Sequence, residues 1–142
     1  SSDLCSDYFG LQQGPATFFD QELKGGSPRI ANNLIPDLIM RLSPEFMIHP
    51  GKVYVQMRGP RFETQAEIRI VKDWGDVIGM TAAHEADLGA EIGLNYNSLA
   101  IVDNYGNGLM KEDIDFEKFK ELVKANQQKV NRLFARMLEI LG

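Results

Sequence analysis

Three short groups of residues carry side chains that could bind a flat nitrogen heterocycle and a neighbouring anion. The groups are Phe62 with Glu63, Met80 with Thr81, and Asp103 with Asn104. Each group is expected to follow directly after a β-strand. Together they supply an aromatic ring, carboxylates, a hydroxyl group at a helix start and an amide. This combination suits a planar base with a phosphate nearby.

Glu63 and Asn104 have the hydrogen-bonding chemistry that would read the edge of such a base. An ionised carboxylate at Glu63 only accepts hydrogen bonds, so it requires a donor such as the N1–H group of a 6-oxopurine. The N1 atom of adenine is an acceptor, and facing it would cost about 1–3 kcal/mol. The Asn104 amide both donates and accepts, so it can serve O6 and N7. If the base is a leaving group, help at N7 is catalytic because charge develops there.

Thr81 and two apolar residues complete this interpretation. Unpaired amides at the start of a helix favour an anion, and the Thr81 hydroxyl adds a further donor at that place. Phe62 and Met80 would supply apolar contacts to the base and the sugar. The six residues therefore predict one pocket for a purine, a sugar and an anion.

Each of these residues also has an ordinary structural explanation, which the sequence leaves open. Glu63 could be a solvated carboxylate favoured by the helix dipole, and Thr81 could be a simple helix cap. Asn104 could serve a turn together with the glycines that follow it. Phe62 could be a core residue. Taken one motif at a time, the ordinary explanation is the commoner one.

The histidines and the single cysteine give weaker indications of chemistry. His84 and Glu85 begin a pattern similar to the HExxH metal motif, but the second histidine of that motif is missing. Both residues are expected on an exposed helix, and His49 is expected in a loop before Pro50. With one cysteine, Cys5, the sequence predicts neither an internal disulfide nor a metal site.

Strand and helix patterns alternate along most of the chain. Strands are predicted over residues 52–57, 76–80 and 97–104, and helices over residues 36–42, from Thr64 onward, over about 84–92 and over 116–141. Thr64 and Glu67 form a capping-box pattern at the start of their helix. The alternation predicts parallel strands joined by right-handed crossovers. Because ligands bind at the carboxyl ends of such strands, the three groups are expected to converge at one edge.

Two segments stand apart from this alternation. The residues up to about Asn33 have the pattern of an irregular, loop-rich region because glycine and proline recur in them. The helix over 116–141 has apolar residues at spacings of three and four, which we assign to the core rather than to a cofactor site. Asp115 is expected to cap that helix.

Composition limits the class of protein. The chain has 142 residues, of which 44% are hydrophobic, enough for one compact domain. A formal net charge of -5 argues against a nucleic acid polymer as partner. No apolar run approaches the roughly 20 residues that a membrane-spanning helix needs, so no membrane partner is expected. These features fit a soluble protein of the reducing cytoplasm.

The chain contains three distinctive blocks, GPRFETQAEIR, GDVIGMTAAHEADLGAEIGLNY and SLAIVDNYGNG. In sequence and spacing these blocks resemble the C-terminal half of the trimeric purine nucleoside phosphorylase and methylthioadenosine phosphorylase family. SDYFGLQQGPATFFD resembles, more loosely, a family strand that leads to a Thr-Phe-Tyr-Asp segment. The resemblance implies an α/β fold, a three-layer sandwich in which helices surround a central mixed sheet.

The resemblance also implies a role for each candidate residue. Phe62 and Glu63 would line the base site, Met80 would contact the ribose and Thr81 would bind phosphate. Asn104 would contact the purine at N7 and O6. The implied reaction is phosphorolysis of 6-oxopurine nucleosides, such as inosine, guanosine or 5'-methylthioinosine, to the free base and a sugar 1-phosphate. Phosphate is the co-substrate, and no metal or organic cofactor is implied.

Departures from the family pattern keep other functions open. The family's N-terminal half, with its Gly-rich phosphate loop, has no counterpart here, so residues 1–142 are expected to be the C-terminal portion of a single domain, incomplete relative to the family. Asp103 stands where a hydroxyl residue is usual. If Asp103 faced the base, 5'-methylthioadenosine would be the substrate. A non-catalytic purine-binding remnant and a nucleoside hydrolase are the remaining alternatives.

The resemblance has a consequence for partner chains as well. Members of the family borrow active-site residues across a trimer interface, so a homo-oligomer, a trimer or hexamer, is expected, or a second chain that supplies the missing half. His84 stands where the family commonly has proline, and Ala90 stands where it often has arginine.

Overall fold

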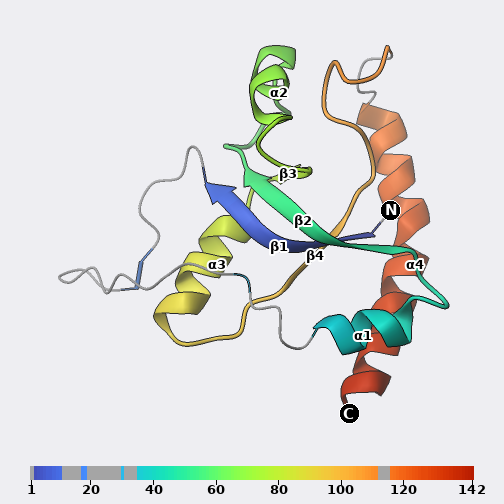
Figure 1. Cartoon of the computed structure of the whole chain (residues 1–142). Coiled ribbons are helices and arrows are strands. Elements are labelled where there is room, and N and C mark those ends of the chain that lie inside the picture. Colours follow the sequence, from blue (N-terminus) through green and yellow to red (C-terminus); the bar gives the residue numbers. More distant parts are fainter. Residues whose placement is uncertain (1, 11–16, 19–29, 31–34, 112–115) are drawn as a thin grey trace.

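Strands and helices alternate along the chain, and the strands form one curled sheet. The structure is a computed structural model that describes residues 2–10, 17–18, 30, 35–111 and 116–142. In chain order the elements are β1 (Ser2–Gly10), α1 (Ile35–Leu42), β2 (Ile48–Gln56), α2 (Gln65–Val71), β3 (Val77–Gly79), α3 (Ala82–Glu91), β4 (Ser98–Ile101) and α4 (Phe116–Leu141). Figure 1 shows the helices packed around the sheet. The α/β class predicted from the sequence is confirmed.

The sheet is mixed, with strand order β3-β2-β1-β4. β1, β2 and β3 are parallel, whereas β4 is antiparallel to β1, with Ile101 opposite Ser2. The resemblance implied a mixed sheet, but the strand-helix alternation predicted parallel pairing throughout, which is wrong for β4. Apolar patterning reports which residues of a strand are buried, and it carries no information on the direction in which the strand runs.

β1 corrects the prediction that the chain is irregular up to about Asn33. Its nine residues form a strand between β2 and β4. The strand contains serine, aspartate and glycine, which are rare in strands, so its sequence gives little signal. Pairing with a strand on each side overrides that weak propensity. Apart from residues 17, 18 and 30, the rest of the predicted irregular region lies outside the described residues.

Neighbouring residues of β2 point to opposite faces of the sheet and join different hydrophobic clusters. Tyr54 packs with Val77 of β3 and Ala82 at the start of α3. Val55 packs with Ile68 of α2. Consequently α3 covers one face of the sheet and α2 covers the other.

A third cluster joins α1 to α4 and fixes the face on which these two helices lie. Its buried members are Leu38, Leu42, Phe46 and Leu133. Leu99 and Ile101 of β4 pack against this cluster. Ala100, between them, packs with the α3 cluster instead. α1 and α4 therefore share a face with α2, and the helices and sheet form the three layers that the resemblance implied.

The apolar stripe of α4 serves as core over only part of its length. Leu133 is buried, and Met137 packs beside it. Several other members of the stripe are largely exposed, namely Phe116, Leu122, Phe134, Leu138 and Leu141. The assignment of the whole stripe to the core is wrong for these positions, because the described residues leave them accessible. Asp115, the predicted cap, lies outside the described residues.

The helix boundaries follow local chemistry. Thr64 Oγ1 accepts a hydrogen bond from the Glu67 N–H at 3.2 Å, and the Glu67 carboxylate accepts one from the Thr64 N–H at 2.7 Å, which confirms the predicted capping box. Gly93, with φ +74, follows α3, as expected of a helix stop. Within the described ranges, no helix has both the length and the apolar content needed to cross a membrane.

Candidate functional site

Glu63 lies in the turn between β2 and α2, and it is buried with 9% of its surface exposed. Its backbone carbonyl accepts a hydrogen bond from Asn107 Nδ2 at 3.3 Å. This burial argues against the alternative of a fully solvated carboxylate at Glu63. Because removing a carboxylate from water is costly unless donors face it, its position suits a group that presents a hydrogen-bond donor.

The segment over residues 102–111, which follows β4, brings Asn107 to Glu63. A side chain at Gly106 would press on Ile68, and one at Gly108 would press on Gln65, so this segment packs closely on α2. Since β4 is antiparallel, its carboxyl end lies at the opposite end of the sheet from the ends of β2 and β3. The expected convergence of three parallel strand ends is therefore wrong. After β4 the 102–111 segment leaves the sheet, runs between α2 and α4 and reaches the start of α2 there (Figure 1).

Asp103 and Asn104 have different environments within that segment. Asp103 is half-buried, and its carboxylate accepts a hydrogen bond from Asn126 Nδ2 of α4 at 2.7 Å. Asn104 is exposed, and its Nδ2 donates to the Tyr105 carbonyl at 2.8 Å. The structure thus ties Asp103 to α4 and leaves Asn104 at the surface of the segment.

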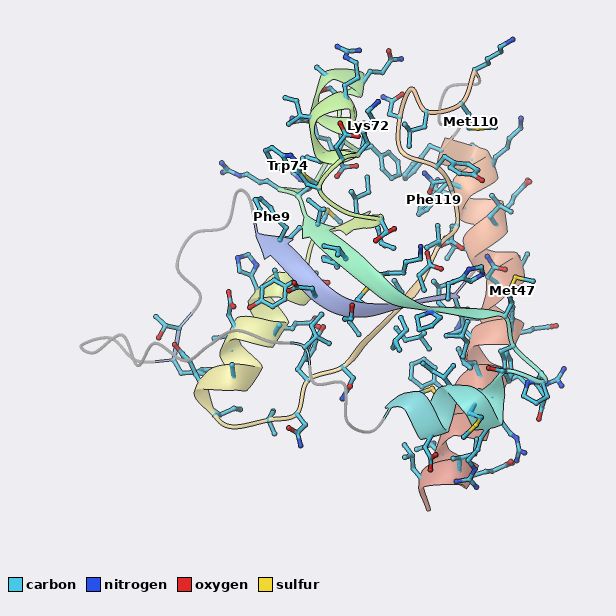
Figure 2. All side chains as sticks on the ribbon, in the orientation of Figure 1. Phe9, Met47, Lys72, Trp74, Met110 and Phe119 are labelled. Atoms are coloured by element: carbon cyan, nitrogen blue, oxygen red, sulfur yellow. The ribbon has the colours of Figure 1, made fainter. Side chains whose placement is uncertain are left out.

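Phe62 packs against α4. Its ring lies edge-on to those of Phe119 and Phe116, with centroids 5.5 Å and 6.3 Å away. Figure 2 shows Phe119 on the side of α4 that faces the 102–111 segment. Phe62 is still 39% exposed, so it is partly a packing residue and partly an accessible ring.

Met80 and Thr81 lie beside the β2–α2 turn because β2 and β3 are paired. Gln56 is opposite Gly79, and the Met57 N–H donates to the Gly79 carbonyl at 2.8 Å. Any side chain at Gly59 would overlap the sulfur atom of Met80. The residues after these two strands, which include Glu63 and Thr81, therefore lie in adjacent turns.

Thr81 is the N-cap residue of α3, but its side chain makes no capping hydrogen bond. Its backbone N–H donates to the Tyr54 hydroxyl at 3.3 Å. The ordinary alternative, in which Thr81 is present to cap the helix, is therefore not what the structure shows. Thr81 is exposed.

Gln56 accepts hydrogen bonds from two backbone amides at the start of α3 that were expected to be unpaired. Its Oε1 accepts from the Ala83 N–H at 2.8 Å and from the His84 N–H at 3.2 Å. Gln56 is 3% exposed. The expectation of free amides for an anion is thus wrong at these two positions, whereas the Thr81 hydroxyl is not used by the cap.

Sequence reasoning missed Tyr54, Gln56 and Asn107. The first two had a detectable signal, because they share one face of the predicted strand over 52–57 and each ends in a polar group. Two polar groups in one inward-facing row require partners, and the start of α3 supplies them. Asn107 gave no signal, since its contact depends on the return of the 102–111 segment.

The two histidines lie in different elements, and only His84 has a side-chain hydrogen bond among the described residues. His84 is half-buried, with Nδ1 2.7 Å from Gln56 Nε2. Glu85 accepts a hydrogen bond from the Tyr96 hydroxyl at 2.6 Å, so His84 and Glu85 each have a separate partner rather than forming a pair. His49 lies within β2 opposite Asp3, not in a loop.

Three pKa values reflect local contacts near these helices. Hydrogen bonds from the Arg61 side chain and then from the Thr64 N–H lower the pKa of Glu67 to about 2. Burial, followed by a hydrogen bond to Glu85, raises the pKa of Tyr96. Burial, followed by a hydrogen bond to Asp87 of α3, raises the pKa of Tyr8. Among the described residues, no group of three or more His, Cys, Asp or Glu side chains could hold a metal ion.

Comparison with known sequences matches residues 14–139 to the phosphorylase superfamily. A probable 6-oxopurine nucleoside phosphorylase of Archaeoglobus fulgidus is 34% identical over 122 residues, which cover 84% of this chain and 50% of that protein. A probable S-methyl-5'-thioinosine phosphorylase of Methanocaldococcus jannaschii is 42% identical over 78 residues, covering 55% of this chain and 31% of that protein. The chain therefore spans half or less of the length of these relatives.

The fold has close counterparts among solved structures. A methylthioadenosine phosphorylase from Schistosoma mansoni, in complex with adenine, superimposes with a TM-score of 0.81. It is 20% identical, and the match covers 99% of this chain and 59% of that chain. At this identity the likeness shows a shared fold. Together with the match over residues 14–139, it establishes that the chain belongs to the phosphorylase superfamily.

Proposed function

We propose that this chain carries the base and ribose sites, and part of the phosphate site, of a purine nucleoside phosphorylase that prefers 6-oxopurines. The substrates are inosine, guanosine or 5'-methylthioinosine, and the products are the free base and a sugar 1-phosphate. The proposal assigns Phe62 and Glu63 to the base, Met80 to the ribose and Thr81 to phosphate. Asn104 is assigned to N7 and O6 of the base.

The observation that carries this proposal is the buried Glu63 beside two turns with complementary chemistry. Asn107 links Glu63 to the segment that holds Asn104, and strand pairing puts the Thr81 turn next to the Glu63 turn. A buried carboxylate that can only accept hydrogen bonds favours a base with an N1–H group. The names of the Archaeoglobus and Methanocaldococcus relatives, a probable 6-oxopurine and a probable thioinosine phosphorylase, support the same preference.

The proposed chemistry transfers the sugar from the base to phosphate. A phosphate oxygen forms a bond to C1' while the bond from C1' to N9 of the purine breaks, and the bonding electrons go to the purine. Negative charge that develops on the base is stabilised at N7 by the Asn104 amide, and a proton taken from water or from dihydrogen phosphate neutralises the departing base. Glu63 holds the N1–H edge, and the Thr81 hydroxyl donates to phosphate. Inorganic phosphate is the co-substrate, and we propose no metal or organic cofactor.

We further propose that the active protein contains more than residues 1–142. The relatives and the solved structure are matched over only part of their length. Other residues of the phosphate site would then come from another part of the same protein, from a second chain or from another copy in a trimer or hexamer. A cytoplasmic location suits the purine substrate and the single thiol of Cys5.

Asp103 is the residue on which the aminopurine alternative depends. Its carboxylate already accepts from Asn126 of α4. If that hydrogen bond persists in the complex, Asp103 is held away from a role as acceptor for the adenine amino group, which favours the oxopurine assignment.

Base release tests the proposal. We would assay inosine, 5'-methylthioinosine and 5'-methylthioadenosine with and without phosphate, on native protein purified so that any partner chain remains bound. Phosphate-dependent release from the oxopurines alone is the expected result. Release that ignores phosphate would indicate a hydrolase, release from the adenine nucleoside would shift the assignment to Asp103, and binding without release would indicate a remnant.

Glu63→Gln sharpens the test because an amide donates as well as accepts. The preference for oxopurine over aminopurine is expected to fall at least about 10-fold, the loss of one matched hydrogen bond. Glu121→Gln, at an exposed position of α4, is the matched control. An unchanged preference in Glu63→Gln would remove Glu63 from the base site.

A further inference from the structure

The start of α3 is capped by a side chain from another element. The Gln56 Oε1 atom, at the end of β2, accepts from the amides of Ala83 and His84, the second and third residues of the helix. These are the amides that an N-cap side chain normally serves. The N-cap residue itself, Thr81, makes no such hydrogen bond.

The backbone conformation at Thr81 is consistent with an exchange of caps, in which the Gln56 side chain caps α3 in place of the Thr81 side chain. Thr81 has φ -132 and ψ -37, whereas Thr64, which caps α2 with its own side chain, has φ -72 and the extended ψ of 159 that is usual for an N-cap. The Thr81 N–H is held by the Tyr54 hydroxyl. Tyr54 and Gln56, from one face of β2, therefore hold the start of α3 without a capping hydrogen bond from the Thr81 hydroxyl.

The same contacts fix the orientation of the Gln56 amide. Two backbone N–H groups can only donate, so the atom they meet must be the oxygen. The Gln56 nitrogen then faces His84 Nδ1 at 2.7 Å and donates to it. This requires Nδ1 to be an acceptor, so the geometry selects the His84 tautomer with its proton on Nε2.

We propose that Gln56 is a positioning residue for the phosphate end of the site. By capping α3 in place of Thr81, it leaves the Thr81 hydroxyl available to donate to the phosphate co-substrate. Gln56 acts through Thr81 and touches neither phosphate nor nucleoside. The role in phosphate binding rests on the proposed function, whereas the exchange of caps rests on the hydrogen bonds alone.

A double-mutant cycle between Gln56→Met and Thr81→Val tests the exchange of caps without any ligand. Thr81→Val alone is expected to leave the unfolding midpoint unchanged. Gln56→Met allows Thr81 to relax into a capping conformation, so adding Thr81→Val to it is expected to lower the midpoint by about 4 °C, the effect of losing one helix cap. Equal effects of Thr81→Val in both backgrounds would overturn the proposal.

Binding of inorganic phosphate, measured by calorimetry on the native protein, tests the functional part. Gln56→Met is expected to raise the Kd for phosphate about 10-fold, as for the loss of one hydrogen bond to an anion. In the Thr81→Val background the same change is expected to have no further effect. Gln128→Met, at an exposed position of α4, is the control. A rise in Kd that is equally large without the Thr81 hydroxyl would overturn the positioning role.

The tautomer of His84 gives a readout that general loss of stability would not change. In the folded wild-type protein, ¹⁵N NMR is expected to show Nδ1 unprotonated and hydrogen-bonded, and Gln56→Met is expected to remove the hydrogen-bond shift. A wild-type His84 with its proton on Nδ1 would contradict the amide orientation. If wild-type protein binds no phosphate while the unfolding cycle behaves as expected, the phosphate role of Thr81 fails and the exchange of caps stands.

Discussion

Two threonines stand at the starts of helices that follow neighbouring parallel strands, and their side chains are used differently. Thr64 caps α2 through its own hydroxyl and shares a capping box with Glu67. Thr81 precedes α3 without capping it, and Gln56 of β2 supplies the cap instead. A local motif stabilises the first helix start, whereas a contact between distant segments stabilises the second. The difference shows that the Thr64 hydroxyl serves its own helix, whereas the Thr81 hydroxyl does not.

This comparison also separates a structural residue from a candidate site residue of the same type. From the sequence, a capping role explained both threonines. The capping-box partner, Glu67, lies three residues after Thr64, whereas the residue three after Thr81 is His84. A histidine side chain cannot complete a capping box. Here the His84 backbone N–H donates a hydrogen bond to Gln56 Oε1 instead.

Phosphate-dependent turnover gives the largest expected difference between the two threonines. Thr81→Val is expected to lower kcat/KM for phosphate by about 10- to 100-fold, because a hydrogen bond to a charged group is lost. Thr64→Val is expected to stay within about twofold of wild type, because its hydroxyl serves α2 alone. Steady-state base release at varied phosphate checks both. Equal losses of kcat/KM in Thr81→Val and Thr64→Val would contradict the assignment of Thr81, and not Thr64, to phosphate.

Gly79→Ala tests the dependence of the α3 start on β2. A methyl group at Gly79 would overlap the Tyr54 hydroxyl, which accepts from the Thr81 N–H. We expect a loss of about 1–3 kcal/mol in the free energy of unfolding from this overpacking. Urea denaturation measures it.

Gly89→Ala is the matched control for Gly79→Ala. At Gly89, inside α3, a methyl group would make only ordinary contacts, the nearest at 3.5 Å from Tyr96. Because alanine is the better helix former, this variant is expected to be neutral or more stable by about 0.5–1 kcal/mol. A stable Gly79→Ala protein would contradict the close approach of Tyr54 to the β3–α3 turn.

Thr64→Val is expected to lower the free energy of unfolding by about 1 kcal/mol, the typical cost of removing an N-cap oxygen. Thr64→Ser keeps the hydroxyl and is expected to remain near wild type. Comparison of the two variants by chemical denaturation separates the effect of losing the hydroxyl group from the effect of changing the volume of the side chain. If Thr64→Val were as stable as wild type, α2 would not depend on its local cap.

The smallest expected effect is the pH dependence of the α2 start. Since the pKa of Glu67 is lowered from 4.5 to about 2, its contribution to stability is complete above pH 4.5 and is lost as the pH falls toward 2. Glu67→Gln keeps an acceptor for the Thr64 N–H but cannot ionise. The difference in unfolding midpoint between wild type and Glu67→Gln is therefore expected to shrink to zero across that range.

Glu121→Gln is the control for this titration. Glu121 lies on the exposed surface of α4. Glu121→Gln measures the effect of removing one exposed carboxylate that caps no helix. Capping of α3 uses the neutral Gln56 amide, so no comparable carboxylate titration is expected at that helix start. A difference for Glu67→Gln that grew as the pH fell would reverse the sign expected from its contacts.

Local signals in the sequence predicted much of the fold. The capping box, the alternating strand over 52–57 and the helix over 116–141 each depend on residues close in the chain, and the structure contains all three. β1 was missed because its strand character depends on pairing with β2 and β4 rather than on its own residues. The direction of β4 was missed because burial patterns are the same for either direction.

The candidate site was predicted in its residue types more than in its geometry. Glu63 and Thr81 follow paired strands as expected, so their turns are adjacent. Asn104 reaches the neighbourhood by a different route, through the return of the 102–111 segment to α2. Whether the six predicted residues share one pocket with a purine stays a prediction.

The sequence by itself determined which family the chain resembles, where most helices begin and which side chains could read a 6-oxopurine, because these depend on residue identity and short spacing. Only the tertiary structure decided that Glu63 is buried, that Asp103 is tied to α4 and that Gln56 rather than Thr81 caps α3. Each of these facts depends on segments 23 or more residues apart in the chain or on burial by them. Hydrogen bonds and burial of that kind are specified by the packing of whole elements, which no short stretch of sequence encodes.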